Sequence, residues 1–398
     1  MRRSGTPRAV RRILGVLVAA ALLSGLGTSA GSASATGSTV TAIDLGTLGG
    51  FLSTAANVSP SGQVVGSSVT AGNAAEHAFS WTQAGGMVDL GTLGGTFSFG
   101  EDVNASGQVV GESATAGNAA EHAFSWTRAG GMIDLGTLGG SFSGANAINA
   151  GGQVVGLSGT TTGTDAFSWT QAGGMVDLGT LGGAFSEADA VNARGQVAGI
   201  STLESFAFHP FSWTRAGGMV DLGSLGGTFS SVTGINASGQ IVGDSETASG
   251  ENHAFSWTQK GGMVDLGTLG GTSAFAFGVN ASGEVVGTST TAGDSEAHAF
   301  TWTQAGGMVD IGGLGGTNNG AKAVNARGQV VGVGSTSGDL LDRGFSWTRT
   351  GGMVELAPPA GYTMSEATAL NARGDVVGLS STADFSAIHA TLWRTGGG

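Results

Sequence analysis

The sequence predicts an all-β protein, an eight-bladed β-propeller of four-stranded blades closed by an N-terminal strand that completes the last blade. Three observations lead to this prediction. Eight tryptophans recur at separations of 43 to 46 residues, 77 of the 398 residues are glycine, and the chain begins and ends with complementary parts of one repeat. Four short strands in about 45 residues is the size of a propeller blade. The tryptophans are Trp81, Trp126, Trp169, Trp213, Trp257, Trp302, Trp347 and Trp393.

The N-terminal 35 residues are typical of a secretory signal peptide. Five arginines lie among the first 12 residues, an apolar run covers 13–26, and small residues at 33–35 suit cleavage. A retained membrane anchor is disfavoured because this run is short for a bilayer. Arg11 and Arg12 leave twin-arginine export open beside the general route. We therefore expect an extracellular protein.

Removal of the signal makes the chain strongly acidic. Ten basic residues then stand against 28 acidic residues, a net charge of −18. Such a protein repels nucleic acid and anionic lipid, so we expect no nucleic-acid partner. No later segment is apolar enough to span a membrane, and we expect a monomer without cofactors.

Each repeat divides into four short strands, here described for the second repeat. The first ends at Asn104, the second covers 108–112, the third 122–127 and the fourth 132–138. The third strand alternates large and small residues, which is a period of two. Asn104-Ala-Ser-Gly107 fits a type I turn between the first two strands. The same Asn recurs as Asn149, Asn192, Asn236, Asn280, Asn325 and Asn371, and the first repeat has Ser59-Pro60-Ser61-Gly62.

The two ends of the chain predict closure. The last repeat stops at its third turn, while 40–48 is a surplus fourth strand at the start. An acidic residue follows each of the first seven tryptophans by eight positions, and Asp44 is the spare acid for the eighth. A linear solenoid would need capping repeats instead, although a right-angled β-solenoid remains the alternative. We therefore divide the chain into a signal at 1–35, a polar lead at 36–39 and one propeller at 40–398.

A phenylalanine lies two residues before seven of the eight tryptophans, and burial of each would contribute about 1.5–3 kcal/mol to stability. These phenylalanines are Phe79, Phe124, Phe167, Phe211, Phe255, Phe300 and Phe345.

The repeated His-Ala-Phe-Ser-Trp followed by Asp-Leu-Gly-Thr-Leu-Gly-Gly resembles the HAF family of extracellular repeat proteins. The His-Ala-Phe triplet is intact at 77–79, 122–124, 253–255 and 298–300. The resemblance covers nearly all of the chain after the signal and implies export and a repeat fold. It implies no activity, cofactor or catalytic residue. Asp165, Arg343 and Thr391 depart from the triplet.

The repeated polar residues are better explained by structure than by chemistry. All six histidines lie four residues before a tryptophan, and we expect each to bond a neighbouring blade and not to bind metal, because equivalent positions lie about 10 Å apart. Each repeated acid supplies one carboxylate, too few for calcium, and is expected to accept turn or strand N–H groups. The glycine-rich stretch lacks the lysine and helix of a phosphate loop. No catalytic triad can be assembled, so we predict no catalytic residues, no metal site and no enzyme.

The most variable position of the first strand lies three residues before the turn Asn. If this strand lines the axis, it carries an acidic mouth with one lysine. The predicted ligand-binding residues are Glu101, Glu187, Asp189, Lys322 and Glu366.

The loops between the second and third strands also vary, for example 203–208 against 247–252. We therefore predict a non-catalytic secreted scaffold that binds wall or matrix polysaccharide, or a protein, on its variable loop face. Two alternatives remain. One is a polysaccharide-acting enzyme that uses Glu101, Glu187, Asp189 or Glu366 as acid and base. The other is a purely structural surface protein, which an apolar patch on the outer rim would favour.

Overall fold

The structure, a computed structural model, describes residues 40–395. These residues form 32 β-strands and two single 3₁₀ turns, Ala71–Asn73 (η1) and Ala116–Asn118 (η2). The all-β prediction is therefore confirmed. The predicted signal at 1–35 and the polar lead at 36–39 lie outside the described residues. Within 40–395, no helix has the length and apolar character needed to cross a membrane.

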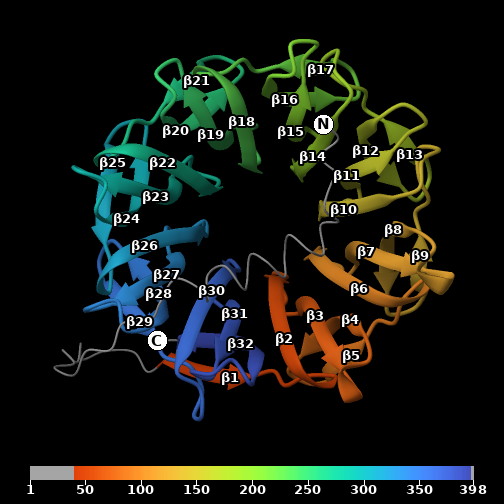
Figure 1. Cartoon of the computed structure of the whole chain (residues 1–398), viewed down its shortest axis with the longest axis horizontal. Helices are drawn as coiled ribbons and strands as arrows, with labels where there is room; N and C mark the ends of the chain where they lie inside the picture. The colour runs from red at the N-terminus through yellow and green to blue at the C-terminus, as the bar shows by residue number, and fades with distance from the viewer. Residues whose placement is uncertain (1–39, 396–398) are drawn as a thin grey trace. The chain divides into compact units, whose positions relative to one another are not determined.

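The strands follow one another in groups of four antiparallel strands, called units 1 to 8 here. Figure 1 shows these units following one another in a circle, with the first strand of each unit innermost. Unit 1 is β2 to β5, each later unit takes the next four strands, and unit 8 is β30, β31 and β32 with β1.

The innermost strands are β2 (Gly49–Val58), β6 (Gly94–Val103), β10 (Ser143–Ile148), β14 (Ser186–Val191), β18 (Gly226–Ile235), β22 (Gly270–Val279), β26 (Gly315–Val324) and β30 (Met364–Leu370). The second strands are β3 (Val64–Thr70), β7 (Val109–Thr115), β11 (Val154–Gly159), β15 (Val197–Thr202), β19 (Ile241–Thr247), β23 (Val285–Thr291), β27 (Val330–Thr336) and β31 (Val376–Ser381).

The third strands are β4 (Glu76–Thr82), β8 (Glu121–Thr127), β12 (Thr164–Thr170), β16 (Phe208–Thr214), β20 (Asn252–Thr258), β24 (Ala297–Thr303), β28 (Asp342–Thr348) and β32 (Ile388–Thr395). The outermost strands are β5 (Gly86–Asp89), β9 (Gly131–Asp134), β13 (Gly174–Asp177), β17 (Gly218–Asp221), β21 (Gly262–Asp265), β25 (Gly307–Gly312), β29 (Gly352–Leu356) and β1 (Val40–Asp44).

The hydrogen-bonded sheets differ from the eight separate blades that the sequence predicted. There are two 12-stranded sheets and two four-stranded sheets. Single parallel pairs between neighbouring units fuse three units into each large sheet, as at Leu52 and Ile388 or Asn252 and Ser273. The fusion arises where the long first strand of one unit starts beside the third strand of the preceding unit.

The first and last strands of the described chain pair with each other, as predicted. β1 runs antiparallel to β32, from Val40 opposite Thr395 to Asp44 opposite Thr391. The Leu45 N–H then donates to the Ala390 carbonyl at 2.9 Å. Leu45 is also buried in a core cluster that contains Phe79 of unit 1 and Leu392 of unit 8. Backbone pairing and apolar burial therefore join the two ends.

The outermost strands are shorter than predicted, and the acid at their end explains why. β9 stops at Asp134, where 132–138 was expected. The Asp134 carboxylate accepts the Gly136 N–H at 2.7 Å, and Gly136 has a φ of +74°. This local bond turns the chain out of the strand. The expectation that the repeated acids bond turn N–H groups is thus confirmed here.

The core lies between units. All seven repeated phenylalanines are fully buried, as expected. Phe300 of unit 6, for example, packs with Val242 and Ala254 of unit 5. Each unit therefore depends on its neighbour to remove its apolar face from water.

A series of asparagine bonds also links the units. The predicted type I turns form, with the Gly107 N–H donating to the Asn104 carbonyl at 3.1 Å. Each buried turn Asn donates its side-chain N–H to the corresponding turn carbonyl of the next unit, and Asn371 of unit 8 donates to Ser59 of unit 1 at 3.0 Å. The other acceptors are the carbonyls of Asn149, Asn192, Asn236, Asn280, Asn325 and Asn371.

Candidate functional site

A β-bulge occupies the same place on every innermost strand. In each unit the register with the second strand shifts at the position three residues before the turn Asn, or before Ser59 in unit 1. A bulge bends the strand and re-aims its side chain. The bulged residues are Ala56, Glu101, Asn146, Asp189, Thr233, Phe277, Lys322 and Thr368. The backbone thus presents one side chain per unit at this place, and only Thr233 and Thr368 are of the same type.

Three of the predicted ligand-binding residues, Glu101, Asp189 and Lys322, are bulged residues. Glu187 and Glu366 lie two positions earlier on their strands, opposite Ile200 and Leu379. All five are therefore on innermost strands, as predicted.

These residues form contacts between neighbouring units. Asn146 of unit 3 donates its side-chain N–H to the Glu187 carboxylate of unit 4 at 3.1 Å. The Lys322 ammonium of unit 7 lies 4.7 Å from the centre of the Phe277 ring of unit 6. Burial raises the pKa of Glu366 in unit 8, and the Lys322 charge opposes that rise. Units 6 to 8 therefore carry an aromatic, cationic and acidic group in sequence around the inner wall.

Their position on the strand separates the bulged residues from the variable loops. Glu101 is third from the end of β6 (Gly94–Val103), next to the short turn that begins at Asn104. The variable loops lie at the opposite end of every unit, because successive strands run antiparallel. The bulged residues Glu101, Asp189 and Lys322 therefore lie toward the short-turn end, away from the variable loops, whereas Glu187 and Glu366 lie nearer the starts of β14 and β30.

Asp102 is a buried acid that was not among the predicted site residues. Its carboxylate accepts N–H groups from Asn57 at 2.8 Å, Val103 at 2.8 Å and Ile148 at 2.9 Å. It therefore joins units 1, 2 and 3. Burial raises the pKa of Asp102, and these hydrogen bonds oppose the rise. The signal was present in the sequence, because other units have Ala, Gly or Asn at this position.

The histidines pair within their own unit, and the expected bond to a neighbouring blade is wrong. His77 lies 2.9 Å from Asp89, and the four equivalent pairs from His122 to His298 have the same geometry. The two residues lie on adjacent antiparallel strands of one unit, which places their side chains together. Arg343 and Glu355 form an equivalent pair at 2.8 Å. Among residues 40–395, no three histidine or acidic side chains gather in a way that could hold a metal ion.

The loop between the second and third strands has the same turn geometry in most units. A residue with positive φ ends the turn in units 1, 2, 4, 6, 7 and 8. Four of these residues are Asn or Asp, which tolerate this conformation: Asn73, Asn118, Asp294 and Asp339. The other two are Phe206, with φ of +66°, and Phe385, with φ of +56°. Phe206 is 84% exposed.

Exposed aromatic side chains gather at this loop end. Apart from a row of valines and one isoleucine on the outermost strands, the exposed large apolar residues within 40–395 all belong to the loops or to strand starts beside them. They are Phe51, Phe142, Phe206, Phe229, Leu340 and Phe385. We call this end, with the loops between second and third strands, the long-loop face.

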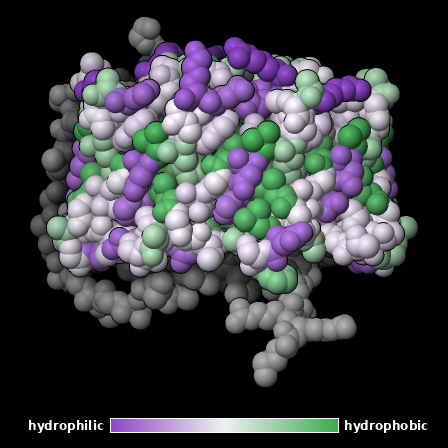
Figure 2. All heavy atoms as spheres, turned by 90° about the horizontal axis from the view of Figure 1, so that it is seen from above, coloured by the Kyte–Doolittle hydropathy of each residue, from purple (hydrophilic) through white to green (hydrophobic). Residues whose placement is uncertain are grey.

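The outer wall shows apolar residues singly. Units 1 to 7 each expose one, and Figure 2 shows hydrophobic patches there interrupted by hydrophilic side chains. They are Val88, Ile133, Val176, Val220, Val264, Val309 and Val354. An exposed acid follows each of them in sequence, so this row is not a continuous apolar patch.

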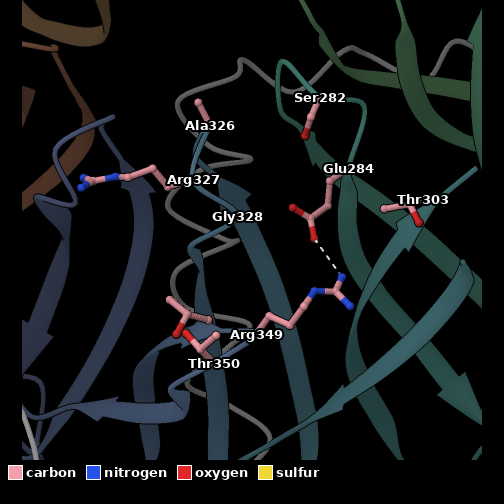
Figure 3. A pocket seen from close by; sticks show the side chains of 9 residues that line it. Ser282, Glu284, Thr303, Ala326, Arg327, Gly328, Arg349 and Thr350 are labelled. Carbon is pink, nitrogen blue, oxygen red and sulfur yellow. Dashed lines mark ion pairs between the residues drawn. The ribbon is translucent and has the colours of Figure 1, made fainter. Parts of the chain in front are cut away.

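A shallow pocket of about 400 Å³ lies between units 6 and 7 at the opposite, short-turn end. Its lining includes Ser282, Glu284, Arg327 and Arg349. Arg349 reaches Glu284 at 3.9 Å, whereas Arg327 points away from both, as Figure 3 shows. The Arg327 guanidinium donates to the Ala372 carbonyl of the next unit. The two arginines therefore do not converge on one point.

Comparison with solved structures identifies the fold. The chain is similar to dipeptidyl peptidase 4 from Porphyromonas gingivalis, with a TM-score of 0.52 and 10% identity over 88% of this chain and 60% of that chain. It is also similar to the β-propeller domain of the Trilobed protease from Pyrococcus furiosus (TM-score 0.47, 11% identity, 72% of this chain and 90% of that one). TolB from Acinetobacter baumannii has a TM-score of 0.40 and 11% identity over 73% of this chain and 64% of that one.

This chain thus spans less than two thirds of the length of dipeptidyl peptidase 4 and of TolB. The similarity to dipeptidyl peptidase 4, at 10% identity, shows the fold alone. The circle of antiparallel units (Figure 1) is the arrangement of a β-propeller. No family profile and no curated protein matches the sequence.

The prediction that the protein is not an enzyme is wrong as it was drawn. Dipeptidyl peptidase 4, to which the chain is similar with a TM-score of 0.52, is named as an enzyme. A propeller brings side chains from distant repeats together, so a catalytic set in this fold need not form a local motif. The lack of a recognisable triad therefore does not exclude catalysis.

Proposed function

We propose that the chain is an exported eight-bladed propeller of the HAF repeat type that binds an extracellular polysaccharide or protein on its long-loop face. The hydrogen bonds that pass from unit 8 to unit 1 support the eight-bladed arrangement. The exposed aromatic residues support the location of the binding face, because such side chains are enriched where proteins recognise partners.

The single observation that carries this proposal is the conformation of Phe206. An exposed phenylalanine with positive φ gains no free energy from apolar burial and has a strained backbone conformation. The equivalent position of sister units holds Asn73, Asn118, Asp294 or Asp339, which form the same turn without this cost. Folding therefore gives no reason for Phe206, and recognition of a partner does.

The test replaces Phe206 and Phe385 by Asn, the residue of sister loops, singly and together. Binding of each variant and of the unaltered chain is compared on a glycan array and on isolated cell walls. We expect these variants to fold and to lose at least tenfold in affinity for a ligand that the unaltered chain binds. A matched control, Val264→Thr on the outer wall, should bind normally. Unchanged binding by the Phe206→Asn, Phe385→Asn double variant would contradict the proposal.

One observation favours a second candidate function, polysaccharide cleavage at the inner wall. Burial raises the pKa of Glu366, which favours the protonated form that a general acid requires. Release of reducing ends from polysaccharides by the chain, abolished in Glu366→Gln, would support this function. The long-loop variants distinguish it from the first, because they leave Glu366 in place.

A further inference from the structure

The basic residues of the described chain are segregated at one end. Residues 40–395 contain ten Lys and Arg. Seven of them lie in the short turns between first and second or third and fourth strands, and Arg394 lies at the same end, next to the last residue of β32. These short turns hold only two acidic residues within 40–395, Glu284 and Asp375, and each lies beside an arginine. The eight basic residues are Arg128, Arg194, Arg215, Lys260, Arg327, Arg349, Arg373 and Arg394. We call this end the short-turn face.

The opposite end has the reverse composition. The loops between second and third strands hold six acids and no Lys or Arg. They are Glu204, Glu251, Asp294, Glu296, Asp339 and Asp384. The chain after residue 39 has a net charge of −18, and yet one of its faces is cationic.

At physiological ionic strength, salt screens the charges of the short-turn face from those of the long-loop face. A seven-residue strand such as β3 (Val64–Thr70) spans about 23 Å at about 3.3 Å per residue. The Debye length at physiological ionic strength is about 8 Å. An approaching polymer therefore meets the short-turn face without the field of the long-loop acids. Acids closer to this face are largely engaged, since Glu284 lies near Arg349 and Asp375 binds Arg373 and Arg394.

The fold does not require these cations. Arg128 and Arg215 occupy a turn position where sister units have Gln83, Gln171 or Gln304. In the same way, Arg194 replaces the serine of other turns, and Lys260 replaces an alanine. Within residues 40–395, Arg128, Arg194, Arg215 and Lys260 are exposed and take part in no ion pair. Their charges are therefore available to a ligand.

We propose that the short-turn face binds an acidic polysaccharide, a polymer with a carboxylate on successive sugars. Guanidinium groups bind carboxylates in a planar, two-bonded geometry. The contacts are individually weak because they are exposed, and a polymer adds them by multivalency. The face holds turn hydroxyls and amides and, among described residues, no exposed large apolar side chain, which suits a hydrated sugar chain. Duplex nucleic acid fits less well, because its charge density of one per about 1.7 Å meets a strongly anionic protein.

The test measures binding of the full chain to polygalacturonate in 50 and 500 mM NaCl, with neutral dextran as the reference polymer. We expect binding to polygalacturonate that weakens at least tenfold in high salt, and none to dextran. The quadruple variant Arg128→Gln, Arg194→Ser, Arg215→Gln, Lys260→Ala should bind at least tenfold more weakly in low salt. Its thermal unfolding should match the unaltered chain, because sister turns already carry the replacements.

A matched pair of double variants separates the face from the net charge. Arg128→Gln with Arg215→Gln and Asn73→Asp with Asn118→Asp both lower the net charge by two. The second pair uses a residue that sister loops contain, since Asn118 and Asp294 accept the N–H groups of the equivalent residues Thr96 and Thr272 on β6 and β22. We expect weaker binding only from the arginine pair. Equal weakening by both pairs would overturn the proposal.

Three further outcomes would also overturn it. These are no binding to polygalacturonate at 50 mM NaCl, tighter binding to duplex DNA than to polygalacturonate, and self-association that the quadruple variant abolishes. The last would identify a second copy as the occupant. The proposal is independent of the long-loop function, because Phe206→Asn should leave polygalacturonate binding unchanged.

Discussion

The Nδ1 atom of His389 lies 2.9 Å from the carboxylate of Asp44, although 345 positions separate the two residues in the chain. Asp44 thereby takes the place in unit 8 that Asp89 and Asp134 have in units 1 and 2, with the same pair geometry. The Tyr362 hydroxyl also donates to Asp44 at 3.0 Å. The first described strand is therefore a full member of the last unit.

Deletion of residues 40–48 should destabilise the whole propeller. It removes the partner of β32 and the buried Leu45 side chain, whose burial alone is worth about 1.5–3 kcal/mol. We expect a marked fall in the denaturation midpoint, measured by urea and circular dichroism. The milder change Asp44→Ala serves as the control and should cost about 1 kcal/mol or less, because the pair is exposed. A deletion variant as stable as the full chain would show that closure contributes nothing.

The turn asparagines should be worth more than their turn geometry. Asn236→Ala removes the bond to the Asn280 carbonyl and leaves a buried acceptor, for an expected loss of about 2–3 kcal/mol. Asn236→Ser should lose about half as much, because Ser59 forms the same turn with its hydroxyl accepting the Gln63 N–H at 3.0 Å. Urea unfolding of the two variants tests this order. Equal losses would mean that the bond between units is without effect.

Replacement of Phe206 by Asn should raise stability. Asn tolerates positive φ, whereas a phenylalanine there costs on the order of 1 kcal/mol. The expected gain is about 0.5–1 kcal/mol in chemical denaturation. Phe255→Ala provides the contrast, because it empties a fully buried site and should cost about 3–5 kcal/mol. A destabilised Phe206→Asn would show that the side chain supports the fold.

Glu366 should make stability depend on pH. Burial raises its pKa above the ordinary 4.5, so the folded protein holds this proton more tightly than the unfolded chain. Its favourable contribution is therefore complete below about pH 4.5 and is lost as pH rises through the folded pKa. The unfolding temperature of Glu366→Gln should decline less over that range than that of the unaltered chain. Lys322→Met should extend the loss to higher pH, and parallel curves for all three proteins would refute this role.

Much of the fold could be read from periodicity. Each unit contacts the same neighbours in the same way, so one repeat of 45 residues contains the pattern of strands, turns and buried phenylalanine. Asn104 and its equivalents predicted the turn, and Asp44 predicted which strand closes the last unit. The length of the outermost strands was overestimated, because the bond from Gly136 to Asp134 is a local competitor that hydrophobic pattern does not reveal.

The candidate sites were less predictable. The sequence placed Glu101 and Lys322 at a variable position, but a bulge is a register shift between two strands and needs both of them. The exposure and positive φ of Phe206 could not be predicted from the sequence alone. Its position, equivalent to that of Asn73, did indicate a residue in a turn. The sequence also shows that Arg128 stands where the first repeat has Gln83. That difference indicates a cationic face only once the fold places all short turns at one end.

By itself, the sequence determined that the protein is built of β repeats, how many units it has and which segments meet at its ends. These properties depend on local pattern and on strand complementarity, which neighbouring residues specify. Only the tertiary structure decided which charges share a face, which sister residues are strained and which partners the buried acids have. Those properties depend on side chains that hundreds of residues separate along the chain and that the circle of units brings together, as it does for Asp44 and His389.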